Sequence, residues 1–176
     1  MKKIIFFLLL IVGFSNFNAQ TSDNPEPERK NDIMIDPIVL IAAPAVNFSY
    51  ERLLNKDAGL GINAVFGLGR DFENFSQFSP YYRMYFGKKY ASGFFVEGFL
   101  PVTFTEDEVY HMAGNSGYYT TENSTTVGIG VAFGGKWVVK RNVVFEASGG
   151  IGRRFGNNDE ISPVTGKGML GIGYRF

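Results

Sequence analysis

The sequence predicts an all-β fold: a closed barrel of eight antiparallel strands in up-and-down (meander) order. From residue 32 onward, eight segments, most of them about 8 to 13 residues long, alternate large apolar side chains with small or polar ones, the two-residue period of a strand. Turn-forming residues separate the segments. The chain is also rich in Gly (22), Phe (18) and Tyr (9) and has no Cys, so the fold forms without disulfides. The predicted strands are residues 33–42, 46–53, 60–68, 81–86, 94–104, 127–137, 143–154 and 167–176.

The first predicted strand is irregular and the next two are regular. Pro37 lacks the N–H that a ladder needs, and a closed barrel offers no free edge for it, so we expect a bulge there. The second and third strands alternate cleanly. Their outward apolar positions are Val46, Phe48, Tyr50, Leu60, Ile62, Ala64, Phe66 and Leu68.

The middle strands carry charge on the face opposite the large apolar residues. In the fourth strand Arg83 lies between Tyr82 and Met84, and in the fifth Glu97 lies between Val96 and Gly98. A polar loop is expected at residues 70–79, and a long, acidic, tyrosine-rich loop at residues 105–124. These charged positions share the period of the small and polar residues, so we assign them to the interior.

The last three strands repeat this pattern. Glycines and single charges such as Lys136 and Glu146 alternate with large apolar residues, and a further loop is expected at residues 156–166. The closing strand is the clearest example, because one face is entirely large and apolar while the other is small or charged. Its apolar face is formed by Leu170, Ile172, Tyr174 and Phe176.

These strands are suited to crossing a membrane. In hydrocarbon every backbone donor and acceptor must be paired, so strands cross only as a closed sheet, usually with an even number of strands. Ten residues at about 3.3 Å each, tilted near 40°, span roughly 25 Å, the height of the apolar band of such barrels. A soluble lipocalin-like barrel, with the apolar face inward, is the alternative. Against it, the apolar face carries almost no charge and the opposite face carries charges of both signs in mid-strand, which is inside-out for a water-soluble protein.

From residue 32 to residue 176 the chain resembles the small eight-stranded outer-membrane barrel proteins, the group that includes the membrane domain of outer membrane protein A. The alternating last strand with its terminal Phe176 resembles the recognition signal of the barrel-assembly machinery. The resemblance implies insertion by that machinery into the outer membrane of a Gram-negative-type bacterium. It implies no single activity, because members include structural, adhesive and enzymatic proteins.

The first 31 residues are expected to lie outside the barrel. Lys2 and Lys3 precede an apolar run that is too short to span a bilayer as a helix, so we interpret residues 1–19 as a secretory signal peptide cleaved after Ala19. An uncleaved anchor is the alternative. Residues 20–31 are polar, contain two prolines and form a flexible lead-in, which leaves residues 32–176 for the barrel.

The charge balance argues against nucleic acid as a partner. Removal of Lys2 and Lys3 takes the 17 Lys and Arg down to 15, against 17 Asp and Glu, and the sequence contains no basic stripe. We expect outer-membrane lipid and lipopolysaccharide as partners, the barrel-assembly machinery during biogenesis, and a monomer. Arg153, outward at the end of its strand, is expected to contact anionic lipid head groups.

The interior is expected to hold balanced charges. Eight strands enclose little more than their own side chains, so buried charges must be paired, and Arg83 with Glu97 is the preferred pair because they lie at similar depth on neighbouring strands. This predicts a structural salt-bridge plug; a gated path for ions or protons, hence a porin-like channel, is the alternative. The predicted interior charges are Asp36, Glu51, Arg83, Glu97, Lys136, Glu146, Arg154 and Arg175.

The long loop is the other candidate site. Tyr110, His111, Tyr118 and Tyr119 could bind a partner there. His111 is the only histidine, and with Ser116 it could resemble a lipid A deacylase, but the spacing departs from the His-x-Ser arrangement of that family. Acidic residues of the loop could hold Ca²⁺, but they lack EF-hand spacing. We therefore expect no catalysis, no cofactor and no metal.

Overall fold

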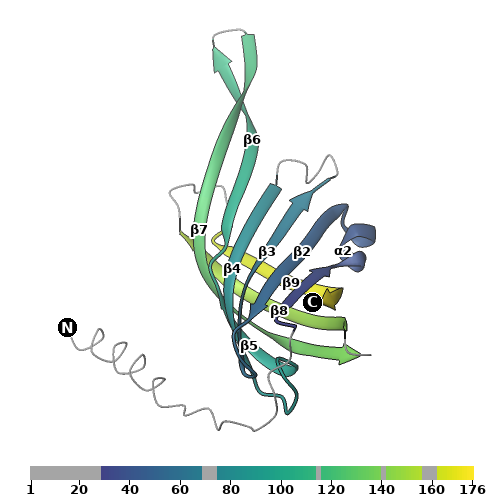
Figure 1. The fold of residues 1–176 in the computed structure, drawn as a ribbon. Coiled ribbons are helices and arrows are strands. Elements are labelled where there is room, and N and C mark those ends of the chain that lie inside the picture. Colours follow the sequence, from purple (N-terminus) through teal and green to yellow (C-terminus); the bar gives the residue numbers. More distant parts are fainter. Residues whose placement is uncertain (1–28, 69–74, 114–115, 140–141, 156–161) are drawn as a thin grey trace, which may run out of the picture.

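The computed structural model describes residues 29–68, 75–113, 116–139, 142–155 and 162–176, and within them the chain is almost entirely strand (Figure 1). The elements in order are β1 (Asn31–Ile35), α2 (Pro37–Ala42), β2 (Ala45–Leu53), β3 (Ala58–Gly67), β4 (Phe75–Tyr85), β5 (Gly93–Phe99), β6 (Val102–Ala113), β7 (Ser116–Val139), β8 (Val143–Phe155) and β9 (Val164–Arg175).

The strands close into a barrel. Strands that follow one another in the barrel wall are antiparallel, and β9 pairs with β1 to complete the circle. β5 and β6 lie in line and share one register: Tyr81 of β4 opposes Phe99, and Phe78 opposes Val102. The break between them lies at residues 100–101, beside Pro80 of β4. Neither Pro80 nor Pro101 has an N–H that could donate to a ladder. The nine strands therefore fill eight positions, which confirms the predicted eight-stranded antiparallel meander.

The strands are strongly tilted. A path through opposed residues that starts at Asp32 of β1 and passes once around the barrel ends at Thr165 of β9. The register of β9 with β1 places Thr165 opposite position 42, which is ten residues beyond the start of the path. An offset of this size in eight strands corresponds to a tilt of about 40°. The residues passed on the way are Glu51, Gly61, Tyr81, Phe99, Gly130 and Gly152.

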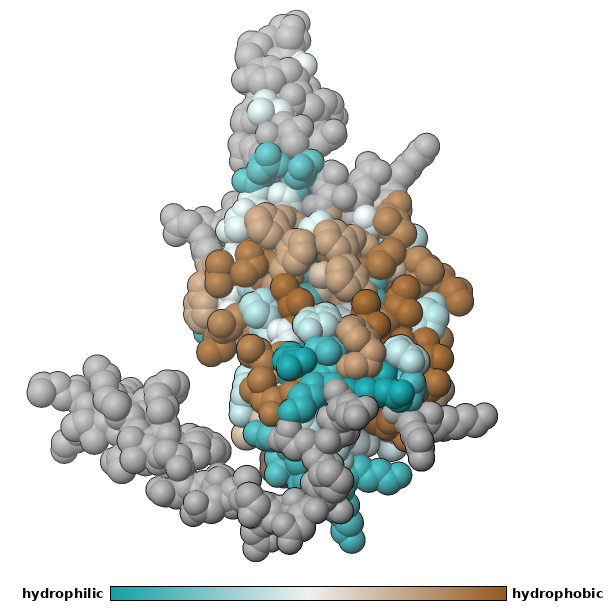
Figure 2. Space-filling model, in the orientation of Figure 1, coloured by the Kyte–Doolittle hydropathy of each residue, from teal (hydrophilic) through white to brown (hydrophobic). Residues whose placement is uncertain are grey.

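The two faces of the wall differ as the alternation predicts. On β9 the inward Met169 is 4% exposed and the outward Leu170 is 53% exposed. Figure 2 shows the outward apolar residues gathered in a broad band across the face in view, with hydrophilic residues below it. Most of the large apolar residues thus form the outer surface of the molecule rather than its core.

One predicted loop is largely strand. Residues 105–124, expected as a loop, continue β6 and β7 as a paired hairpin from Glu106 opposite Asn123 to Ala113 opposite Ser116. The hairpin extends well beyond the rest of the wall (Figure 1). Its threonines and tyrosines favour strand, but being polar on both faces it lacks the apolar period by which the other strands were found.

Two other predicted loops are shorter than expected. β4 begins at Phe75, so the end of the loop predicted at residues 70–79 is strand, and β9 begins at Val164 rather than at residue 167. Residues 69–74 and 156–161, which include the rest of these loops, lie outside the described residues, as do the predicted signal peptide and most of the lead-in.

The prediction of a strand over residues 33–42 is wrong beyond Ile35. Asp36 caps a short helix: its Oδ1 accepts hydrogen bonds from the backbone N–H of Ile38 at 2.9 Å and of Val39 at 3.0 Å. Pro37 then begins α2, where a missing N–H costs nothing. In the described part of the chain, no helix is long and apolar enough to cross a membrane.

Because β1 ends early, the outer half of β9 lacks a strand partner on that side, and side chains take its place. The Asn47 side chain donates to the Gly168 carbonyl at 2.8 Å, and the Leu170 N–H donates to Oδ2 of Asp36 at 2.8 Å. We call this junction of β9, α2 and β2 the seam. α2 contacts both strands there and leaves its Ile38 and Ile41 exposed on the outside.

Asp36 therefore holds both the helix and the seam, and Asp36→Ala is expected to lower the free energy of unfolding by about 2 to 4 kcal/mol, from the lost cap and an unpaired buried N–H. Asp36→Asn, which keeps an acceptor oxygen, should lose less. The temperature at which the compact form unfolds, followed by gel migration of heated and unheated samples, measures both. Equal stability of Asp36→Ala and the exposed-site control Asp57→Ala would contradict this role.

Candidate functional site

The barrel interior holds a group of buried charges that we call the charged cluster. Four cations and four anions project inward from seven strands, so the cluster is neutral as a whole. Its members are Asp32, Glu51, Arg83, Glu97, Lys136, Glu146, Lys167 and Arg175.

Arg83 is the centre of the cluster. Its guanidinium donates to Glu97 at 2.7 and 3.0 Å, to both oxygens of Glu146 at 2.7 and 2.9 Å, and to Glu51 at 3.1 Å. The side chain is 1% exposed. The predicted pair of Arg83 with Glu97 is confirmed, and the planar guanidinium also joins two carboxylates from other strands, as its fork geometry allows.

Lys136 connects this centre to β1. Its ammonium donates to Glu51 and, at 3.1 Å, to Asp32, and lies 3.9 Å from Glu146. Glu51 also accepts a hydrogen bond from the Tyr85 hydroxyl at 2.6 Å. Each carboxylate is thus held by more than one donor, which offsets the cost of removing it from water.

Arg175 closes the end of the barrel that has the short turns. It donates to Asp32 at 2.7 and 2.9 Å and to the backbone carbonyls of Tyr90 and Ala91 in the turn between β4 and β5. Ala91 packs there with Leu53, Tyr85 and Phe95 in a fully buried apolar cluster. Turn, arginine and apolar side chains together cover this mouth.

Aromatic rings fill the space around the cations. The Arg83 guanidinium lies 3.8 Å from the ring centroid of Phe95, and the Lys167 ammonium, which also pairs with Glu97, lies 4.0 Å from that of Tyr81. Such contacts favour a desolvated cation.

Inward glycines make room for these large side chains. A Cβ at Gly59 would come within 2.0 Å of Glu51, and one at Gly61 within 2.4 Å of Tyr81. These contacts are far below van der Waals distance, so the glycines are required by packing.

The half of the interior nearer the seam is polar but mostly uncharged. Gln77 accepts hydrogen bonds from the hydroxyls of Thr103 at 3.1 Å and Thr165 at 2.9 Å, and Asn63 donates to Asn47 at 2.7 Å. We call these residues the amide layer. It links five strands without ion pairs.

Six of the eight predicted interior charges come together in the cluster, and two do not. Asp36 is buried but belongs to the seam, and Arg154 lies away from the cluster, where it donates to Thr165 at 3.1 Å. Asp32 and Lys167 were missed. Both positions are found if the inward alternation is continued two residues further, from Met34 to Asp32 and from Met169 to Lys167.

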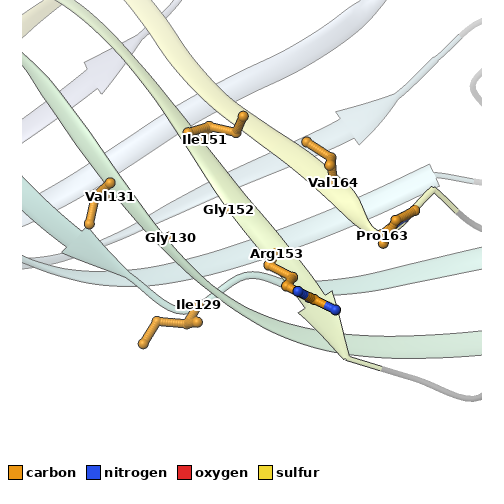
Figure 3. Close-up of a pocket in the computed structure, with 8 residues that line it drawn as sticks. All are labelled: Ile129, Gly130, Val131, Ile151, Gly152, Arg153, Pro163 and Val164. Atoms are coloured by element: carbon orange, nitrogen blue, oxygen red, sulfur yellow. The ribbon is translucent and has the colours of Figure 1, made fainter. Parts of the chain in front are cut away.

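The predicted outward residues are exposed. Leu170, Ile172, Tyr174 and Phe176 are 53%, 41%, 49% and 49% exposed, as expected for one face of β9. Arg153 is also exposed, and it borders a cleft on the outer wall, shown in Figure 3.

The candidate loop residues lie in the hairpin of β6 and β7. Tyr110 opposes Tyr119 and His111 opposes Tyr118 in the ladder, so their backbones are ordered as strand. Their side chains lie outside the described part, as does that of Ser116. Among described residues, no group of three or more His, Asp or Glu could hold a metal ion.

Comparison with known proteins leaves the family open. No protein-family model and no curated protein sequence matches the chain. Three solved structures are similar: Ail from Yersinia pestis in a phospholipid bilayer nanodisc (19% identity over 85% of this chain and 100% of that one, TM-score 0.46), the N-terminal β-barrel domain of OprF from Pseudomonas aeruginosa (14%, 84% and 96%, 0.43), and Neisserial surface protein A (15%, 84% and 94%, 0.41). The barrel assignment rests on the strand register given above.

Arg83→Ala is expected to lower the free energy of unfolding by about 3 to 5 kcal/mol, because it leaves three buried carboxylates without their shared cation. Glu97→Ala should destabilise the barrel likewise, by freeing Arg83 and Lys167 of a partner. Urea unfolding of the refolded protein in detergent measures both. The matched control is Lys56→Ala, which removes a half-exposed pair at 3.9 Å and should change stability by about 1 kcal/mol or less; an equal effect of all three would show that the cluster is not specially stabilising.

Proposed function

We propose that this protein is an integral outer-membrane β-barrel with a side-chain-filled interior, and that it serves a structural or adhesive role through its external hairpin and loops. The observation that carries the proposal is the inverted distribution of polarity. Phe133 and Val131 are 65% and 62% exposed on the outside, whereas Arg83 and Lys136 are 1% and 0% exposed inside. A water-soluble protein has the reverse arrangement.

The position of outward charges supports the membrane assignment. Among the described strand side chains, outward charges occur only near the rims, at Arg52, Glu106 and Arg153. The ten steps from Val143 to Arg153 along β8, at about 3.3 Å each and a tilt near 40°, span roughly 25 Å, the height of an outer-membrane apolar band. The apolar residues of this band would meet lipid, and export by the predicted signal peptide would bring the chain there.

The hairpin of β6 and β7 supports an adhesive role. Beyond Thr105 on β6 and Val127 on β7, these strands pair only with each other among the described residues. In the described part of the chain, each of these two strands therefore has one edge without a strand partner outside the barrel, and an extended segment of a partner can add to such an edge by backbone hydrogen bonds. Acidic side chains and tyrosines on the hairpin would select the partner. Catalysis, cofactors and metals form no part of the proposal.

The filled interior is proposed to prevent conduction. The charged cluster uses its donors on its own carboxylates, and Arg175 with the turn between β4 and β5 covers one mouth. Purified protein in planar bilayers is expected to show no sustained current at neutral pH. Steady, ion-selective openings would overturn the plug and support the channel alternative.

Phe176 is proposed to direct assembly by the barrel-assembly machinery. Phe176→Ser keeps the backbone hydrogen bonds between residue 176 and Asn31, at 2.8 and 2.9 Å, and removes the aromatic ring. The level of folded protein in the outer-membrane fraction is expected to fall severalfold, and to fall further when Phe176 is deleted. Phe94→Ser, which removes another outward ring, is the control; an equal loss in that variant would mean that hydrophobicity, not the terminal signal, is responsible.

A further inference from the structure

A cleft of about 660 Å³ lies on the outer wall across β7, β8 and β9 (Figure 3). It faces outward, toward the region that the proposed function assigns to lipid. Its lining is apolar except for one guanidinium at the end nearer the rim. The side chains that line it are Ile129, Val131, Ile151, Pro163, Val164 and Arg153.

Three outward glycines lie next to the cleft, toward the middle of the wall. Gly149 opposes Gly168, and Gly166 opposes Ile151, which lines the cleft. A Cβ at Gly149 would meet nothing within 4 Å. The nearest atom to a Cβ at Gly168 would be 3.4 Å away, and the nearest atom to a Cβ at Gly166 would be 3.9 Å away. None of the three has a positive φ.

These glycines are therefore required by neither packing nor backbone conformation, in contrast to the inward Gly59 and Gly61. Glycine within a strand weakens it by roughly 0.5 to 1 kcal/mol relative to alanine. The outward glycines leave the wall beside the cleft without side chains. We call the cleft together with this stretch the hollow; from Arg153 to Gly149 it runs about 13 Å along β8. Phe133, opposite Gly149 on β7, forms one side, and α2, which contacts β9, lies on the other.

Arg153 determines which molecule fits the hollow. It is exposed at the rim, where a charge is tolerated, and no carboxylate among the described residues pairs with it. A guanidinium binds phosphate oxygens in a bidentate manner. An apolar hollow that ends at such a group fits a hydrocarbon chain attached to a phosphorylated head group.

We propose that this hollow is a binding site for lipopolysaccharide of the external leaflet, with one acyl chain along Gly149, Gly166 and Gly168 and a phosphate on Arg153. The site rests on the proposed outer-membrane function and deepens it by naming a lipid and its contacts. It differs from general solvation of the barrel by lipid because it is confined to one part of the wall.

The test uses refolded full-length mature protein in mild detergent, with purified lipopolysaccharide added and bound lipid counted by native mass spectrometry. Arg153→Gln is expected to weaken binding about tenfold, as for a lost charge-assisted hydrogen bond. Gly149→Leu and Gly168→Leu, made separately, should weaken it as well by filling the hollow. Controls are Gly98→Leu, at another outward glycine whose Cβ would meet nothing within 4 Å, and Arg52→Gln at the other rim.

The proposal holds if only the Arg153, Gly149 and Gly168 variants lose binding and if dephosphorylated lipopolysaccharide binds the wild type weakly. Equal binding by all variants, equal losses in the controls, or full binding of the dephosphorylated lipid would overturn it. Because Arg153→Gln changes an exposed side chain, its folding is not at risk. Binding to refolded protein is independent of cellular location, so cell fractionation tests the outer-membrane proposal separately.

Discussion

The interaction on which the rest of the barrel depends is the contact of Arg83 with three carboxylates from three other strands. A cation without access to water needs anions, and those anions need further cations, which Lys136, Lys167 and Arg175 supply. Such a network adds less stability than its number of contacts implies, because desolvation offsets much of the attraction. Its clearer effect is on register: a slip of one residue would turn Arg83 to the outer face, so the cluster holds each strand in one alignment.

The two halves of the interior solve different problems. In the half with the charged cluster, β1 completes the ladder and the side chains need only satisfy one another. In the other half, β1 gives way to α2, and backbone groups of β9 lose their partners. Amide and carboxylate side chains supply the missing donors and acceptors, as Asn47 and Asp36 do. Side chains thus replace a strand along this part of β9.

Alternation alone was sufficient to predict the eight wall positions, the two faces and the pair of Arg83 with Glu97. In a barrel wall, the two-residue period determines which side chains point inward and which point outward. It failed where another signal was stronger. Asp36 followed by Pro37 is a helix cap and first position, which we interpreted as a strand with a bulge. The β6–β7 hairpin has no apolar face, so periodicity could not reveal it. The seam was not predictable from pattern, since it depends on which side chains meet across the closed barrel.

The charged cluster is neutral as a whole, and each of its cations already has a carboxylate partner. An ion entering the interior would have to displace Lys136 or Arg83 from carboxylates that already hold them. The recognition surfaces proposed above lie outside this interior: the hairpin edges that have no strand partner among the described residues, and the hollow beside Arg153. The side chains of Glu51 and Tyr81 occupy the space that a Cβ at the inward Gly59 or Gly61 would need, whereas the space outside Gly149 is open.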